Sequence, residues 1–147
     1  MDFLNFNPAF LFDPLAKFFV FVILLISIPS AVYSLGYLKG EYSSRKIISG
    51  WILMLIFIGS MLGLVTTGNA LVFLFIWEIM SLVSFFLVIF DSEHWPTVKA
   101  GIIYLVMTHL GTAFITAAFL LMFQSARSFD FIVLKSRNIK AFNLFFE

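Results

Sequence analysis

Four long apolar stretches constrain this chain more than any other feature of its sequence. They cover residues 18–38, 47–65, 70–90 and 100–123. Each is close to the roughly 20 apolar residues that a helix needs to cross a bilayer. Lipid offers no partner to backbone N–H and C=O groups, so a spanning segment bonds them internally, as a helix does. The sequence therefore predicts an all-α membrane protein, a bundle of four transmembrane helices.

The composition excludes a soluble enzyme. The 147 residues are 62% hydrophobic and 12% charged, and the mean hydropathy is +1.07, whereas soluble domains carry about 25% charged residues. A formal net charge of +1 lacks the basic footprint of a protein that binds nucleic acid. The chain has no cysteine, and His94 and His109 are too few and too far apart for a metal site. We expect no catalytic centre, metal or cofactor in this chain.

The segments outside the apolar stretches divide the chain into three parts. Residues 15–123 form the predicted transmembrane domain, and its short links predict that successive helices are neighbours. Residues 1–14 are rich in Phe but interrupted by Asn, Pro and Asp, which predicts an interfacial segment. Residues 124–147 mix apolar and basic side chains, which predicts an amphipathic or partly disordered tail.

One ionisable residue, Glu78, lies well inside the third apolar stretch, and Trp77 precedes it. An acid at that depth costs about 2.5–3.5 kcal/mol on insertion scales, and it is tolerated where it faces protein or trapped water. Ser81 and Ser84 follow and predict a polar strip along the same helix. Two interpretations stay open: Glu78 exchanges a proton within an assembly, or it bonds a neighbouring helix as structural glue.

The fourth apolar stretch carries a polar stripe of its own. His109, Thr112 and Thr116 recur at helical spacing, and Thr108 adjoins them. Histidine titrates near neutral pH and suits a proton relay, but it can equally be a packing residue, and threonines commonly bond the carbonyl of the preceding turn. Lys99, where this stretch begins, is either a functional cation or an anchor that extends to the headgroups.

Small residues predict close helix packing. Gly59 and Gly63 form a G-x-x-x-G pattern in the second apolar stretch. This pattern lets helix backbones approach closely in membranes. We therefore expect the face that carries these two glycines to pack against another helix.

The third and fourth stretches resemble a known family. The segment WEIMSLVSFFLVIF begins at Trp77, Asn69 stands in the turn before it, and Lys99 opens the next stretch. This combination resembles the antiporter-like membrane subunits of respiratory complex I, Mrp antiporters and membrane-bound hydrogenases. Its wording is most similar to the formate hydrogenlyase branch, the proteins like hydrogenase-4 component B.

The resemblance implies a role in proton translocation. By position, Glu78 matches the membrane-embedded glutamate of the family, and Lys99 matches a lysine that pairs with it or modulates it. His109 falls in a T-x-x-G segment where relatives place a basic or polar residue. The resemblance implies a multi-pass protein of the cell inner (cytoplasmic) membrane. Its partners would be other membrane subunits of a hydrogenase or of a complex similar to complex I.

The chain resembles only the beginning of such subunits, which carry a dozen or more helices. We therefore expect a truncated or split piece of a proton-translocating subunit of a membrane-bound hydrogenase or of an NADH:quinone oxidoreductase-type complex. The alternative is a small structural or assembly membrane protein without transport activity, in which Glu78 is glue and the glycine face mediates association.

Overall fold

A computed structural model describes residues 10–41, 43–90, 95–126, 128–133 and 136, and it contains four long helices. They are α1 (Pro14–Glu41), α2 (Ser44–Thr66), α3 (Ala70–Val88) and α4 (Trp95–Ala126). All four are long and apolar enough to cross a membrane, so the prediction of an all-α protein with four transmembrane helices is confirmed.

Two helices begin several residues before the apolar stretches that predict them. Helix α1 begins at Pro14, four residues before its apolar stretch, because the Asp13 carboxylate accepts a hydrogen bond from the Ala16 N–H at 2.7 Å. Proline suits this first position because its missing N–H would have no partner there. Helix α4 likewise begins at Trp95, directly before Pro96.

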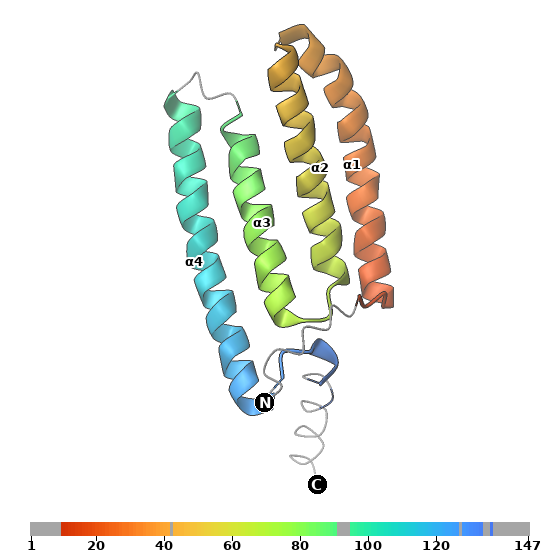
Figure 1. Cartoon of the computed structure of the whole chain (residues 1–147), viewed down its shortest axis with the longest axis vertical. Coiled ribbons are helices and arrows are strands. Elements are labelled where there is room, and N and C mark those ends of the chain that lie inside the picture. The colour runs from red at the N-terminus through yellow and green to blue at the C-terminus, as the bar shows by residue number, and fades with distance from the viewer. Residues whose placement is uncertain (1–9, 42, 91–94, 127, 134–135, 137–147) are drawn as a thin grey trace.

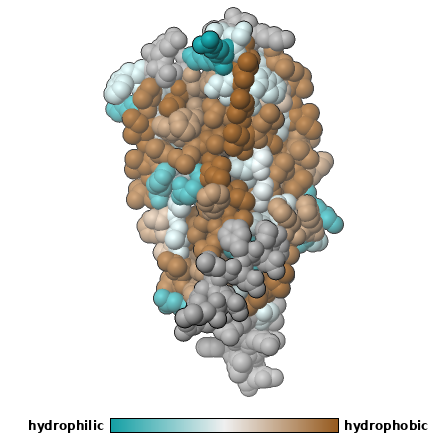
Figure 2. Space-filling model, in the orientation of Figure 1, coloured by the Kyte–Doolittle hydropathy of each residue, from teal (hydrophilic) through white to brown (hydrophobic). Residues whose placement is uncertain are grey.

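The helices lie side by side in chain order, each packed against its sequence neighbour (Figure 1). Among the described residues, the buried apolar side chains are few: Ala16, Ile23, Ala70 and Val83. Figure 2 shows a mostly hydrophobic face with small hydrophilic patches at mid-height. The helices therefore form an open layer, and most of their apolar surface faces outward.

Three segments meet at the turn between α2 and α3, a contact region that we call the polar clasp. It joins residues 66–70 of the turn to residues 10–11 before α1 and residues 129–131 after α4. Three backbone hydrogen bonds connect them: Leu11 N–H to Thr66 O (2.7 Å), Ala70 N–H to Phe129 O (2.9 Å) and Phe131 N–H to Gly68 O (2.9 Å). The beginning of the expected tail therefore packs against the helical layer.

Asn69 is the centre of the polar clasp and is 5% exposed. Its side-chain oxygen accepts hydrogen bonds from the N–H groups of Leu71 (2.9 Å) and Val72 (3.4 Å), which caps the first turn of α3. Its amide nitrogen donates to Asp130 Oδ1 at 3.0 Å. One side chain therefore begins a helix and holds the segment that follows α4. Residues 1–9 and 137–147, which belong to the predicted interfacial segment and tail, lie outside the described residues.

Candidate functional site

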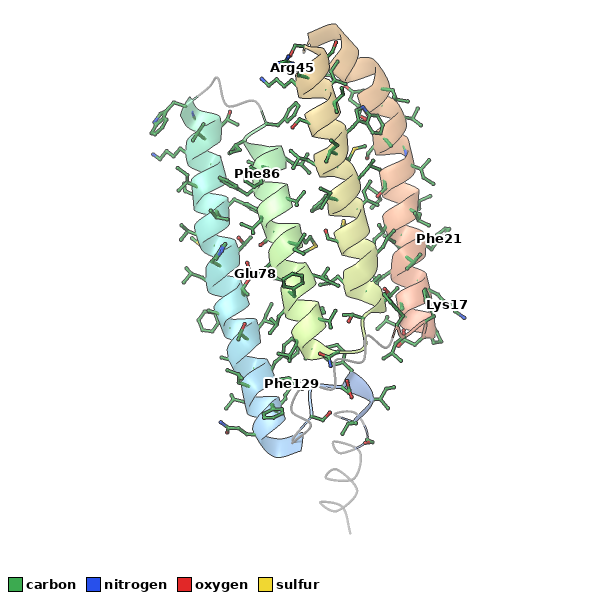
Figure 3. All side chains as sticks on the ribbon, viewed as in Figure 1. Lys17, Phe21, Arg45, Glu78, Phe86 and Phe129 are labelled. Atoms are coloured by element: carbon green, nitrogen blue, oxygen red, sulfur yellow. The ribbon has the colours of Figure 1, made fainter. Side chains whose placement is uncertain are left out.

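Glu78 and His109 meet between α3 and α4. Their Oε2 and Nε2 atoms are 3.7 Å apart, and their side chains are 34% and 51% exposed. Figure 3 labels Glu78 at mid-height of α3. Of the three residues expected to handle protons, the fold thus brings two together, in the middle of an apolar layer.

The other ring nitrogen decides which form of His109 faces the acid. Nδ1 lies 2.9 Å from the carbonyl oxygen of Leu105, one turn earlier. A carbonyl can only accept, so Nδ1 carries the hydrogen and donates it. Nε2 is therefore the nitrogen without this hydrogen bond, and it is the one that faces Glu78. The two atoms lie within ion-pair distance, so a carboxyl group and an imidazole face each other between the two helices.

Two further polar contacts join α3 to α4 on either side of this pair. The indole N–H of Trp77 donates to Thr112 Oγ1 at 3.1 Å. The hydroxyl groups of Ser84 and Tyr104 form a short contact. We call these contacts, together with the Glu78–His109 pair, the polar seam. The sequence shows that Trp77 adjoins Glu78, but it offers no partner for Trp77 or Tyr104, because such partners depend on the register of the two helices.

The supporting hydroxyl groups bond mainly to their own helices. Ser81 donates to the backbone oxygen of Glu78 at 3.0 Å. On α4, Thr108 donates to Leu105 O at 2.9 Å and Thr112 donates to Thr108 O at 3.0 Å. These contacts correspond to the packing role left open for the threonines, although Thr112 also accepts from α3. Thr116 is half-buried further along α4.

Lys99 lies away from the pair. It is exposed near the start of α4, and it makes no ion pair with any residue in the described part of the chain. His109 follows ten residues later, which is about 15 Å along a helix axis at 1.5 Å per residue. Lys99 can therefore influence Glu78 only at long range in this arrangement.

The close approach between α3 and α4 occurs at a glycine other than the two predicted ones. A Cβ atom added at Gly101 would overlap the Ile89 side chain. At Gly63 the added atom would meet Ile76 at 3.4 Å, an ordinary contact, and at Gly59 it would meet nothing within 4 Å. A packing role for Gly59 and Gly63 toward another protein stays a prediction.

The donor groups of the site are few. The described ranges contain no group of three or more His, Cys, Asp or Glu side chains that could hold a metal ion. The site offers a carboxyl group, an imidazole and hydroxyl groups.

Comparison with known proteins gives the family. Residues 67–146 match the family model "NADH:quinone oxidoreductase/Mrp antiporter, TM". Residues 1–46 match the model "NADH-Ubiquinone oxidoreductase (complex I), chain 5 N-terminus". The first match covers more than half of the chain. This protein belongs to the NADH:quinone oxidoreductase/Mrp antiporter family. The resemblance inferred from Trp77, Glu78 and the residues around them is thereby confirmed.

Curated relatives come from several branches of this family. Hydrogenase-4 component B of Escherichia coli is 39% identical over 81% of this chain and 17% of its own length. NADH-ubiquinone oxidoreductase chain 5 of Paramecium tetraurelia is 37% identical over 65% of this chain and 16% of its own. The putative antiporter subunit mnhA2 of Staphylococcus saprophyticus is 28% identical over 97% of this chain and 18% of its own.

The chain spans about a sixth of the length of these relatives. It therefore corresponds to part of an antiporter-like membrane subunit. With four membrane-crossing helices, it is a multi-pass membrane protein. The segment that begins at Trp77 covers the later part of α3, the helix that contributes Trp77, Glu78 and Ser84 to the polar seam.

Proposed function

We propose that this chain is part of a proton-translocating subunit of a membrane-bound hydrogenase or of an NADH:quinone oxidoreductase-type complex in the cytoplasmic membrane. The observation that carries the proposal is the 3.7 Å approach of Glu78 Oε2 to His109 Nε2 within an apolar layer. Relatives named as a hydrogenase component, a complex I chain and an antiporter subunit support the assignment. Membrane subunits of such a complex would be its partners.

In this proposal, Glu78 and His109 exchange a proton. An acid inside a membrane is costly unless it faces protein or water, and the imidazole gives the carboxyl group a partner that can accept or return its proton. The Leu105 carbonyl keeps His109 in the tautomer that presents Nε2 to Glu78. Lys99 acts on this pair at long range, and the hydroxyl groups of Ser81, Thr108, Thr112 and Thr116 are supporting polar groups.

The test is proton pumping by inverted membrane vesicles from cells that carry Glu78→Gln in the chromosomal copy. Acidification of the vesicle lumen is driven by NADH or by hydrogen and followed with a pH-sensitive dye. Glutamine keeps the shape of the side chain but cannot release a proton, so we expect pumping to fall to the leak rate. Asp13→Asn is the matched control, because it removes a carboxylate outside the span and keeps a residue that caps helices well.

The structural alternative gives the opposite result. If Glu78 only bonds α4 as glue, Glu78→Gln leaves pumping intact, since glutamine still offers hydrogen bonds to its neighbours. If vesicles with Glu78→Gln pump protons as well as vesicles with Asp13→Asn, the proposed function is overturned.

A further inference from the structure

The proposed proton exchange gives no role to Trp77, an aromatic residue whose indole carries a polar N–H group. It precedes Glu78 on α3, and its indole N–H reaches across to Thr112 on α4 at 3.1 Å. Thr112 is 8% exposed, and its hydroxyl also donates to Thr108 O at 3.0 Å. The threonine oxygen thus accepts one hydrogen bond and donates another, so its orientation is held from both helices.

The indole ring is also held by aromatic contacts. Trp77 stacks on Phe73 with ring centroids 5.8 Å apart and an interplanar angle of 24°. Phe73 in turn forms T-shaped pairs with Phe119 on α4, with ring centroids 5.7 Å apart, and with Phe131 beyond α4, with ring centroids 6.3 Å apart. Such pairs contribute about 0.5–1.5 kcal/mol each beyond their buried area. The indole N–H is therefore directed at Thr112 by packing on its own helix.

The proton pair cannot supply this alignment itself. A separation of 3.7 Å between Oε2 of Glu78 and Nε2 of His109 is longer than a hydrogen bond. By contrast, the bond between Trp77 and Thr112 is direct and adjoins the pair on both helices. Trp77 is the neighbour of Glu78, and Thr112 lies one turn after His109, on the same side of α4. A slip of one residue, about 1.5 Å along the axis, would break this bond.

We propose that Trp77 and Thr112 are positioning residues that hold the His109 imidazole against the Glu78 carboxyl group. The functional meaning of this step rests on the proposed proton exchange, but the geometry can be tested apart from it. The indole–hydroxyl bond fixes the register and rotation of α4 on α3. Without it, α4 stays packed through its other contacts with α3, including the Ser84–Tyr104 contact, while the imidazole moves away from the acid.

The experiment measures the separation of the pair directly. The full chain is placed in lipid bilayers with ¹³C in the glutamate side-chain carboxyl groups and ¹⁵N in histidine. His94→Gln in every sample leaves His109 as the remaining histidine. Rotational-echo solid-state NMR then reports how strongly a glutamate carboxyl carbon dephases the Nε2 signal, and that dephasing falls steeply with distance.

Two variants remove the bond and two keep it. Trp77→Phe retains a stacking ring without the N–H, and Thr112→Val retains the shape without the hydroxyl, so we expect both to lose the dephasing. Thr112→Ser restores the hydroxyl and should restore the dephasing. Trp95→Phe is the control for losing an indole, because Trp95 is 73% exposed at the start of α4.

Each outcome decides the proposal. Dephasing that persists in Trp77→Phe or Thr112→Val overturns it, as does dephasing that Thr112→Ser fails to restore. If Trp77→Phe does not fold, the valine and serine variants at position 112 give the answer alone. The two proposals fail separately. Normal pumping in Glu78→Gln refutes the proposed function, whereas the dephasing results alone decide the positioning role of Trp77 and Thr112.

Discussion

Replacing Asn69 by alanine tests how much of the stability of the layer depends on the polar clasp. The substitution removes the cap of α3, which contributes about 1 kcal/mol and ranges from about 0.5 to 2. It also removes the 3.0 Å hydrogen bond to Asp130, and bonds to charged groups contribute about 1.5–3 kcal/mol. Because Asn69 is 5% exposed, water replaces neither bond well. We expect Asn69→Ala to lower the free energy of unfolding by about 2–4 kcal/mol.

The assay is reversible unfolding of the full chain from mixed micelles by sodium dodecyl sulfate, followed by tryptophan fluorescence. Asp130→Ala removes the tail contact and keeps the cap, so it separates the two contributions. In that background, Asn69→Ala should cost only the cap, about 1 kcal/mol. The reasoning fails if Asn69→Ala costs less than about 0.5 kcal/mol, or if its cost is the same with and without Asp130, because the two residues would then not be coupled.

Two further substitutions test the seam between α3 and α4. Gly101→Ala should destabilise the chain by about 1–3 kcal/mol in the same unfolding assay, because the added methyl group overlaps the Ile89 side chain. Gly111→Ala on the same helix is the control: its methyl group meets nothing within 4 Å, so the substitution should be neutral or stabilising. Equal effects of the two substitutions would contradict the packing of α4 described above. For Lys99→Gln, a unit charge about 15 Å away at an effective dielectric constant of about 20 contributes about 1 kcal/mol. We therefore expect pumping to slow by no more than about fivefold, and a loss as complete as that of Glu78→Gln would place Lys99 in contact with the acid.

Much of the fold follows from hydropathy, because lipid leaves an apolar stretch of this length little choice but a helix. The four helices were predictable for this reason, and so was the antiparallel pairing of neighbours, since short links permit nothing else. The helix ends were less predictable: α1 begins at Pro14 through the carboxylate of Asp13, a local polar contact that a hydropathy pattern does not contain.

The ionisable pair of the site was predictable, but its alignment and the other contacts of the polar seam were not. Glu78 and His109 stand out as ionisable groups in neighbouring apolar helices, so their proximity could be anticipated. Which residues meet depends on the register, and side-chain packing sets the register. Because α3 and α4 are antiparallel, Ser84 contacts Tyr104, and Glu78, earlier on α3, faces His109, later on α4. No periodicity within one helix reveals such a correspondence.

The docking of the segment after α4 could not be predicted for a similar reason. Its basic and apolar residues are typical of an amphipathic tail, yet Phe129 and Phe131 form backbone hydrogen bonds with the turn that begins α3. The N–H of Ala70, the first residue of α3, and the carbonyl of Gly68, in the turn before it, have no partner within a helix and would need water or another segment. The backbone groups of this turn therefore bond the segment after α4, which is distant in sequence but adjacent in space.

We expect the polar clasp and the polar seam to have different roles: the clasp stabilises the helical layer, and the seam aligns α4 with α3. The polar clasp bonds chain segments at one end of the layer, where backbone groups outside the helices need partners. The polar seam lies at mid-height, where few polar side chains are available and each can specify one register. Under the proposed function, the long 3.7 Å separation of Glu78 and His109 fits this division, since a pair that exchanges a proton must be free to change its charge state. Under the same proposal, the direct bond between the Trp77 indole and the Thr112 hydroxyl stays the same in every charge state of the pair, so it would hold the helices in one register while the proton moves.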